Sequence, residues 1–314
     1  MSAPEGRGGR GPVVVLAGGT GGAKLARGMQ DVVRDELVVV ANTADDVEIH
    51  GAHVSPDPDL VTYWLADRID ERGWGLRDDT FHVMDGMREL GVDVWFNLGD
   101  RDLAVCLRRA ERLAAGATLT TALRELGEAL GVTARVLPMT DAPVRTKVLA
   151  GGEWWPFQEF MIRRGGAGPV EGVEYEGVRA ASPPAEALDA IAAARAIVVG
   201  PSNPVISIGP VLAVPGMADA IAAAPAPVVA VSPIVDGEVL KGPTAEFLRW
   251  AGQSMDAAGI AAAYGGLIDG LVTDERAELD VPSLVTSTLM ADSASRERVA
   301  RETLEFALAL ASAA

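Results

Sequence analysis

The chain has 314 residues, a net charge of −17 and a hydrophobic fraction of 49%. This length is enough for one large domain or two ordinary ones, each with a full core. The acidic charge argues against a nucleic-acid partner, because phosphate backbones attract basic surfaces. It does not exclude one small phosphorylated ligand. No apolar run reaches the roughly 20 residues that a membrane helix needs, so we expect no membrane partner.

The N-terminus and the cysteine content bear on location. Residues 1–12 are polar and rich in glycine and arginine, and they lack the apolar segment of a signal peptide, which predicts a disordered tail. Cys106 is the single cysteine, so no internal disulfide can form, and we expect it in the packed face of a helix over residues 102–112. These features predict a cytoplasmic protein.

The first structural signal is a glycine-rich segment between a predicted strand and a predicted helix. Residues 13–17 form an apolar run typical of a buried parallel strand, and residues 23–33 carry apolar side chains at helical spacing. Between them stand Gly18, Gly19, Thr20, Gly21 and Gly22. Backbone N–H groups of such a loop can close on an anion, and the helix dipole adds to the attraction. We predict a nucleotide diphosphate site; the alternative is a tight turn without a ligand.

The segment matches neither of the two common phosphate motifs. A Walker loop ends in Gly-Lys-Ser/Thr, whereas here Ala23 precedes Lys24 and Leu25 follows it. The dinucleotide pattern G-x-G-x-x-G also fails, because Lys24 stands where the third glycine belongs. A nicotinamide-dependent dehydrogenase is therefore disfavoured.

The remaining elements alternate between strand and helix. We predict strands at 37–41, 92–96 and 135–137, and helices at 60–72, 103–115 and 119–130. Short β-rich segments separated by glycines predict an inserted antiparallel β-rich subdomain at 141–181. Alternation then resumes with strands at 196–199, 228–231 and 267–272 and a closing helix at 297–311. The pattern predicts a single α/β domain over 13–314, doubly wound around a mostly parallel Rossmann-like sheet.

Five polar, glycine- or proline-containing loops follow predicted strands. They span residues 18–22, 42–46, 97–102, 200–204 and 232–237. The carboxyl ends of parallel strands lie along one edge of a sheet, where ligands bind. The five loops are therefore expected to line one crevice.

Two of these loops offer carboxylates and polar groups for a nucleotide and a metal. Asp45 and Asp46 suit Mg²⁺ beside a phosphate, although one of two adjacent side chains is expected to face the cleft. The alternative is that one of them caps the following segment. Gly200, Ser202 and Asn203 lie in a rigid loop suited to a ribose or a purine edge.

Other polar and aromatic residues have competing interpretations. Asp59 is either functional or the N-cap of helix 60–72, and Asn97 contacts a ring or ribose or merely fixes its turn. His50 and His53 lack a third ligand, which disfavours a transition-metal site. The aromatic residues Trp154, Trp155 and Phe157 stack on a flat ligand or form the insertion's own core. No Gly-x-Ser-x-Gly elbow follows a strand, so a hydrolase triad is not expected.

These motifs resemble a known family. In order they read GGTGGAKL, NTADDVEIHG, SPDPDLVTYWLAD, DDTF with MRELG, NLGDRD, GPSNP and SPIVDGEVLKGP. As a set they resemble the 2-phospho-L-lactate transferase family of deazaflavin coenzyme F-420 biosynthesis, from about residue 13 to residue 273. The composition, rich in alanine, glycine and arginine, favours the branch that uses a phosphoenolpyruvate-derived donor, but no single residue distinguishes it from a phospholactate-derived one.

The resemblance implies a reaction. GMP is joined through a diphosphate to enolpyruvate or lactate, and the ribityl hydroxyl of the deazaflavin acceptor attacks the phosphorus next to the three-carbon acid. Mg²⁺ is implied as the cofactor, and a homodimer as the assembly.

The resemblance also implies residue roles. Gly18–Gly22 and Lys24 would hold the diphosphate, with Ser202 and Asn203 near the guanosine. Asp45 would bind the metal, and Asp59 and Asn97 would contact the deazaflavin. The general base is left open between Asp45, Asp59 and metal-assisted deprotonation. The alternative function is a nucleotide-sugar-binding regulatory protein that shares the Gly-Gly-Thr-Gly loop and lacks catalysis.

Overall fold

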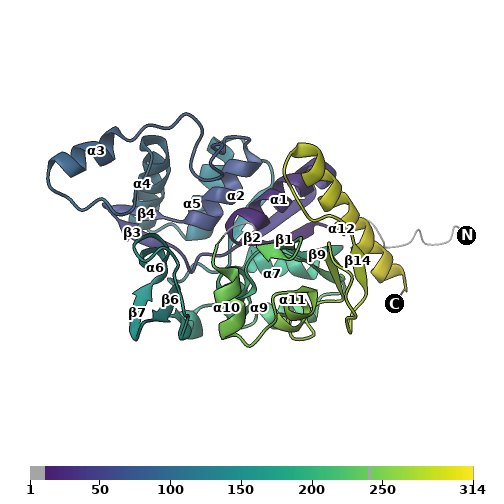
Figure 1. Ribbon diagram of the computed structural model, residues 1–314. Helices are drawn as coiled ribbons and strands as arrows, with labels where there is room; N and C mark the ends of the chain where they lie inside the picture. The colour runs from purple at the N-terminus through teal and green to yellow at the C-terminus, as the bar shows by residue number, and fades with distance from the viewer. Residues whose placement is uncertain (1–10, 240–241, 314) are drawn as a thin grey trace, which may run out of the picture.

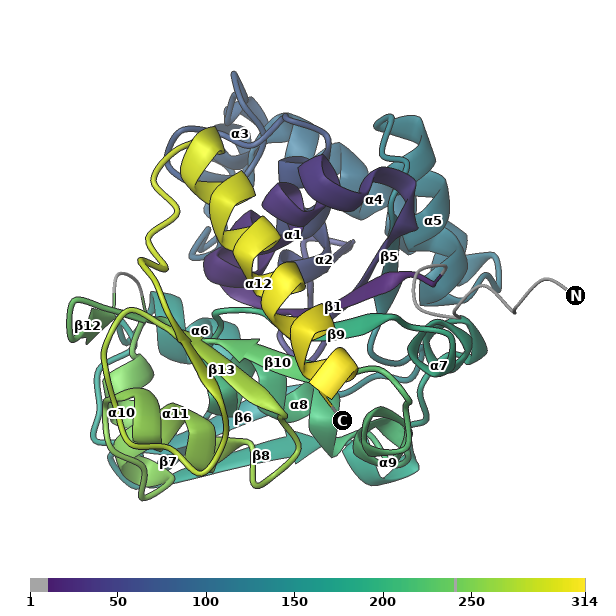
Figure 2. The same cartoon turned by 90° about the vertical axis from the view of Figure 1, so that its right-hand side faces the viewer.

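The computed structural model describes residues 11–239 and 242–313. Its centre is a seven-stranded, all-parallel sheet in the order β14-β13-β10-β9-β1-β2-β5 (Figures 1 and 2). The strands are β1 (Val13–Ala17), β2 (Leu37–Ala41), β5 (Arg135–Pro138), β9 (Ala196–Val199), β10 (Val228–Val231), β13 (Gly270–Thr273) and β14 (Ser283–Val285). The chain runs outward from β1 through β2 to β5, then returns to build the other half from β9, so the order reverses between β1 and β9.

Helices cover both faces of this sheet, and others lie in the segments between its strands. The helices of the described residues are α1 (Gly19–Val33), α2 (Pro56–Leu65), α3 (His82–Glu89), α4 (Asp100–Ala114), α5 (Leu119–Ala129), α6 (Phe157–Ile162), α7 (Ala185–Ala192), α8 (Gly209–Ala213), α9 (Met217–Ala222), α10 (Thr244–Trp250), α11 (Ala257–Ala263) and α12 (Ser293–Ala313). Short 3₁₀ turns lie at η1 (Arg34–Glu36) and η2 (Val178–Ala180), and a π-helical turn at η3 (Pro204–Ile208). The predicted doubly wound α/β fold is confirmed.

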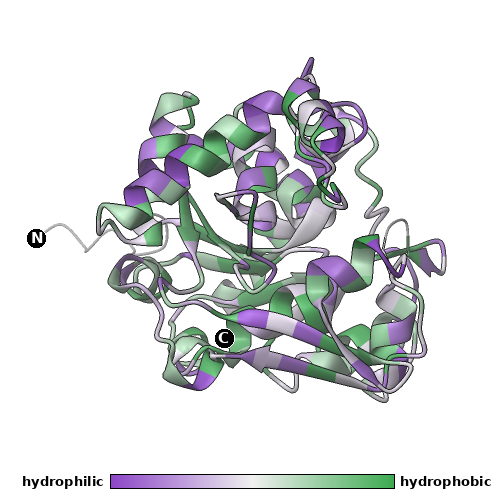
Figure 3. Ribbon diagram, turned by 90° about the vertical axis from the view of Figure 1, so that its left-hand side faces the viewer, coloured by the Kyte–Doolittle hydropathy of each residue, from purple (hydrophilic) through white to green (hydrophobic). Residues whose placement is uncertain are grey.

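The sheet is the core because its central strands are apolar on both sides. Every residue of β1 and β2 is buried, as expected for parallel strands covered on two faces. Val13 and Val15 pack with α1, α2 and α12, whereas Val14 and Leu16 pack with α7, α8, α9 and α11. Figure 2 shows these two helix layers on opposite sides of the sheet, and Figure 3 shows hydrophobic residues concentrated in the central strands.

Two insertions stand between strands of the sheet and carry small sheets of their own. The helical insertion (residues 45–130) contains α2–α5 and the hairpin of β3 (Val47–Ile49) and β4 (Ala52–Val54). The β-rich insertion (residues 141–181) contains α6 and the antiparallel sheet of β7 (Glu153–Pro156), β6 (Arg145–Ala150) and β8 (Gly172–Glu176). A small hairpin, β11 (Ile234–Val235) with β12 (Glu238–Val239), follows β10. In Figure 1 the two insertions lie on the same side of the molecule, with the helical insertion above the β-rich insertion.

Several element predictions need correction. Residues 92–96 form no strand; Val94 and Phe96 instead pack on a small cluster beside α3 and α4, and their alternation imitates a half-buried strand. The predicted helix 60–72 begins at Pro56 and ends at Leu65, and the segment 141–181, predicted to be β-rich, also contains helix α6.

Other predictions for the chain have mixed outcomes. Cys106 is buried in α4, as expected. The tail predicted at 1–12 falls almost entirely outside the described residues. Within the described ranges, the helices are all too short or too polar to cross a membrane.

Gly28 allows α1 and α12 to pack closely, and this contact is testable. A Cβ at this position would lie 2.3 Å from the carbonyl oxygen of Arg296 in α12. We expect Gly28→Ala to lower the stability by about 1–3 kcal/mol, because the two backbones must separate. The matched control is Gly86→Ala in α3, where a Cβ meets no atom of the described chain within 4 Å. The control should be neutral or stabilising by up to about 1 kcal/mol. Equal thermal unfolding midpoints for Gly28→Ala and wild type would show that this packing is not tight.

Candidate functional site

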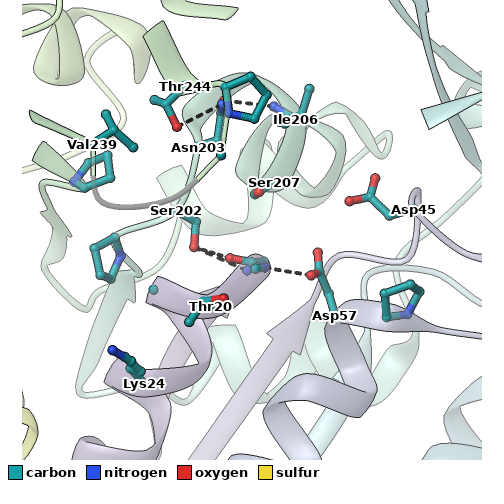
Figure 4. Close-up of a pocket in the computed structure, with 18 of the residues that line it drawn as sticks. Thr20, Lys24, Asp45, Asp57, Ser202, Asn203, Ile206, Ser207, Val239 and Thr244 are labelled. Atoms are coloured by element: carbon teal, nitrogen blue, oxygen red, sulfur yellow. Dashed lines mark hydrogen bonds between the residues drawn. The ribbon is translucent and has the colours of Figure 1, made fainter. Parts of the chain in front are cut away.

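A cavity of about 490 Å³ lies at the point where the strand order reverses, and we call it the first cavity. Its walls come from the loops after β1, β2, β9 and β10, from α2 and α6, and from the segment between β14 and α12. A crevice at such a switch point is where ligands bind in open α/β sheets. Figure 4 shows the residues that surround it. Four of the five predicted loops therefore do converge, whereas 97–102 follows no strand of the sheet.

The glycine-rich segment is the first turn of α1 and not a separate loop. Gly18 is the N-cap, and Gly19 begins the helix at φ +64°. A Cβ on Gly21 would lie 1.9 Å from the carbonyl oxygen of Pro201, and one on Gly22 would lie 2.8 Å from Ser202 Oγ. These two glycines are therefore required for packing on the 200–204 loop.

Backbone amides at the start of α1 divide into two groups. Gly18 N–H donates to Ser202 Oγ (3.4 Å), and Gly19 N–H donates to Asp57 Oδ1 (2.7 Å). The N–H groups of Thr20 and Gly21 belong to the first helical turn, where helix geometry provides no acceptor within the helix, and both residues line the cavity. The candidate anion site is therefore these two amides, strengthened by the helix dipole.

Lys24 lies one turn further along α1 and also lines the first cavity. Its ammonium group donates to the carbonyl oxygen of Met290 (3.1 Å) and lies 5.9 Å from the centre of the Trp64 ring. The lysine is thus held at the wall of the cavity that Thr20 and Gly21 also line.

The 200–204 loop lines the cavity but uses much of its polarity internally. Ser202 Oγ donates to the carbonyl oxygen of Gly18. Asn203 Oδ1 accepts from the N–H groups of Val205 (2.8 Å) and Ile206 (3.2 Å), which caps η3. A Cβ on Gly200 would lie 3.0 Å from both Gly22 Cα and the carbonyl oxygen of Leu16. These residues shape the floor of the cavity more than they offer groups to a ligand.

Asp45 faces the first cavity, and Asp46 does not. Asp46 accepts from Ser55 Oγ (2.8 Å) and contacts His53 Nε2 (3.0 Å), so both of its oxygens are engaged in the β3–β4 hairpin. Neither aspartate caps a helix, because β3 follows them. Of the two predicted metal ligands, Asp45 therefore remains as the candidate.

Among the described residues, no lysine, arginine or histidine forms an ion pair with Asp45. Its Oδ1 is buried and has no hydrogen-bond partner among the described residues. Burial, followed by repulsion from Asp57, raises the pKa of Asp45 well above its ordinary value. A buried oxygen ligand with this electrostatic cost is suited to a divalent cation, which would supply the missing charge.

Asp57 is the main residue that the sequence analysis missed. Its Oδ1 accepts from Gly19, and its Oδ2 accepts from Asn42 Nδ2 (2.9 Å), so it ties α1, α2 and the loop after β2 together. Burial raises the pKa of Asp57 to about 6, although these hydrogen bonds lower it. The sequence did contain a signal for this role, because Asp57 follows Ser55 near the start of a predicted helix, where a carboxylate can accept backbone N–H groups.

A second cavity of about 440 Å³ adjoins the first. Four of the residues that line it are aromatic, namely Tyr63, Trp74, Trp95 and Phe96, and most of the others are apolar or acidic. Both cavities are lined by Pro56 and Asp57, so the start of α2 is their common wall. This arrangement offers a flat aromatic ligand a site next to an anion site.

Asp59 and Asn97 both line this second cavity. Asp59 is not an N-cap, because α2 begins three residues earlier and the Asp59 N–H bonds to the carbonyl oxygen of Ser55. Its Oδ1 accepts from buried Arg109, whereas its Oδ2 is buried without a hydrogen-bond partner in the described part of the chain. Burial raises the pKa of Asp59 to about 7 against the opposing effect of Arg109. Asn97 is exposed, and its Oδ1 accepts from Arg88 (2.7 Å).

The remaining candidates lie outside both cavities, with one exception. His53 pairs with Asp46 and Glu48, and His50 occupies the β3–β4 turn at φ +53°. Trp154 is 46% exposed. Phe157 is the exception, since it packs in the core of the β-rich insertion and also lines the first cavity.

Comparison with known proteins places the chain in a family. The family model described as 2-phospho-L-lactate transferase CofD matches residues 13–303. The 2-phospho-L-lactate transferase of Methanosarcina mazei is 38% identical, covering 85% of this chain and 88% of that protein. The phosphoenolpyruvate transferase of Kitasatospora aureofaciens is 39% identical, covering 94% and 97%. That of Streptomyces coelicolor is 41% identical, covering 83% and 85%.

A solved structure shares the fold. It is a UPF0052-family protein from Bacillus halodurans, with a TM-score of 0.60 at 17% identity, covering 94% of this chain and 100% of that one. The match of the family model over the whole sheet and both insertions, together with these identities, shows that the chain belongs to the 2-phospho-L-lactate transferase CofD family.

Proposed function

We propose that the protein transfers an enolpyruvyl-phosphate or 2-phospholactyl group from a guanosine diphosphate conjugate to the ribityl hydroxyl of an 8-hydroxy-5-deazaflavin, in coenzyme F-420 biosynthesis. The observation that carries the proposal is the pair of adjoining cavities, one with an anion site and one with aromatic walls. Family membership and the names of the relatives support the chemistry of the transferred group.

The first cavity is the proposed donor site. The amides of Thr20 and Gly21 and the ammonium group of Lys24 would hold the diphosphate, and the guanosine would extend along the 200–204 loop. The switch-point position supports this assignment, because helix N-termini at such crevices bind phosphate groups. An overall charge of −17 is compatible with it, since these local groups supply the positive field.

Asp45 is the proposed Mg²⁺ ligand. Its unpartnered, buried oxygen supports this role, and a bound magnesium ion would supply positive charge beside the phosphate oxygens. Asp46 is too fully hydrogen-bonded within its hairpin to be a second direct ligand.

The second cavity is the proposed acceptor site. Trp95 and the neighbouring aromatic rings would contact the flat deazaflavin, and Asp59 and Asn97 would orient it. The acceptor hydroxyl oxygen attacks phosphorus, the phosphorus–oxygen bond to the leaving phosphate breaks, and GMP departs with the electron pair. The hydroxyl proton passes to Asp59 or Asp45, or would leave with the help of a bound metal ion. Such a reaction depends on positioning and charge neutralisation more than on a protein nucleophile.

The regulatory alternative, a nucleotide-sugar-binding protein, requires the first cavity alone. The aromatic second cavity therefore favours the transferase.

We also propose, on the family resemblance, that the protein is a homodimer. Light scattering that gives the mass of one chain would exclude a dimer.

The proposed reaction is tested by incubating the protein with the deazaflavin and each synthetic donor in turn. We expect a phosphodiester product of the mass set by the donor, together with one equivalent of GMP. Absence of product with both donors, in a protein that still binds GDP, would favour the regulatory alternative.

Asp45→Asn tests the metal assignment. The substitution keeps the shape of the side chain but removes its charge. We expect turnover to fall at least about 100-fold, in line with the several kcal/mol that a catalytic metal supplies, with partial recovery at high Mg²⁺. The matched control is Asp46→Asn, whose magnesium titration should follow that of the wild type. Overlapping magnesium titrations for Asp45→Asn and wild type would contradict the assignment.

Asp45→Asn should lower turnover but raise the stability of the ligand-free protein. Because the pKa of Asp45 is raised by folding, the native state binds its proton more tightly than the unfolded chain does. Stability is therefore lost as the pH rises from about 4 through the folded pKa. At pH 8, without metal, Asp45→Asn should unfold at least about 2–4 °C above wild type, and the gain should vanish at low pH. Calorimetric scans at both pH values measure this; a lower midpoint at pH 8 would show that Asp45 is stabilised by an internal partner.

Trp95→Ala tests the acceptor site. Losing one stacked ring should weaken deazaflavin binding by about tenfold, with GDP affinity unchanged. The matched control is Trp154→Ala, which removes an exposed ring that lines neither cavity. Fluorescence titration with deazaflavin measures both variants. Equal deazaflavin affinities would place the acceptor elsewhere.

A further inference from the structure

Arg109 is a charged side chain that the proposed reaction does not yet use. It lies in α4 of the helical insertion and is completely buried. Its Nη1 donates to the carbonyl oxygen of His53 (2.8 Å), and its Nη2 donates to Asp59 Oδ1. The guanidinium thus connects α4 to the end of the β3–β4 hairpin and to α2.

These contacts give the two carboxylate oxygens of Asp59 different surroundings. Arg109 holds Oδ1, whereas Oδ2 is buried, has no hydrogen-bond partner among the residues described, and belongs to a residue that lines the second cavity. An unpaired buried acceptor costs free energy until a donor reaches it. The hydroxyl of an acceptor bound in this cavity is a donor of the required kind.

The surroundings of Asp59 are mostly acidic. From α4, Asp102 and Cys106 approach it, with ligand atoms of the three residues within 4.8 Å of one another. From α2, Tyr63 donates to Asp102 Oδ1 (2.6 Å). The charge of Asp46, in the loop after β2, acts on Asp59 from greater distance. Arg109 supplies an opposing positive charge beside Asp59, so the Asp59 carboxylate is paired with a guanidinium inside a mostly acidic cluster.

Stability alone is a weak reason for such a pair. Replacing a buried ion pair by apolar residues of similar volume is often neutral or stabilising, because removing two charges from water is costly. A planar guanidinium, unlike an apolar residue, can fix the orientation of the carboxylate that it binds, because its N–H groups have a rigid geometry.

We infer that Arg109 is a positioning residue that fixes the plane of the Asp59 carboxylate at the wall of the acceptor cavity, so that Asp59 accepts the proton of the attacking hydroxyl. The inference rests on the proposed transfer reaction. In the step, the hydroxyl O–H bond breaks and an O–H bond to Asp59 Oδ2 forms. The freed electron pair forms the bond to phosphorus, and GMP leaves with the electrons of the broken phosphorus–oxygen bond.

Arg109→Met tests this role, since methionine is apolar and buried readily at such a position. Loss of the positive charge should move the acid limb of the kcat/KM profile upward by about one pH unit or more. At pH 7 we expect kcat to fall at least about tenfold, with the GDP dissociation constant changed less than about twofold. Arg109→Lys keeps the charge without the fork, so its acid limb should stay near that of wild type while its kcat remains reduced.

The matched control is Arg112→Met, one turn further along α4. Arg112 pairs with Glu125 at the surface, where both side chains are 31% exposed. This variant should keep the wild-type pH profile. If Arg109→Met lowers the unfolding midpoint but leaves the acid limb unchanged, Arg109 is a structural strut and the inference is wrong. If that variant does not fold, a wild-type kcat in Arg109→Lys overturns the inference equally.

A substrate-free measurement separates this inference from the proposed function. The carboxyl carbon of Asp59 can be followed by NMR during a pH titration of ligand-free protein. An inactive wild-type enzyme would refute the transfer reaction. The titration would still show whether Arg109 controls Asp59, and equal titration midpoints in wild type and Arg109→Met would overturn that control.

Discussion

The contact between the start of α1 and the 200–204 loop is the constraint on which the site depends. Gly21 and Gly22 let the helix backbone meet that loop without an intervening Cβ, and Ser202 hydrogen-bonds to Gly18. This contact closes the floor of the crevice between β1 and β9. It also presents the amides of Thr20 and Gly21 at the cavity surface, where the helix dipole adds to their attraction for an anion.

The two insertions extend this crevice to an adjoining second cavity. Helix α2 of the helical insertion carries both boundary carboxylates, because Asp57 lines both cavities and Asp59 lines the second. Asp57 is itself held by Gly19 and Asn42, so this hydrogen-bonded carboxylate is one of the contacts that fix the second cavity relative to the first. A rigid connection of this kind suits a reaction in which an acceptor must be positioned against a donor phosphate.

The parts of the fold that sequence predicted well are those determined by local burial. Strands β1 and β2 are apolar on both faces, and the loops that follow them are necessarily at one edge. Residues 92–96 were mispredicted because their alternating side chains cover a small cluster and a cavity rim, which gives the same pattern as a strand. Arg109 and Asp59 are 50 residues apart, and no local pattern predicts their contact. Likewise, glycine at position 21 signals close approach, but the sequence does not say whether a ligand or another loop approaches.

The central claim is that donor and acceptor occupy adjoining cavities at the same time. Deazaflavin fluorescence, titrated with protein in the absence and presence of saturating GDP and Mg²⁺, tests it most directly. The account predicts that the deazaflavin stays bound when GDP is added, with an affinity equal to or higher than before. Competitive displacement of the deazaflavin by GDP would show that both ligands share one cavity and would contradict the account.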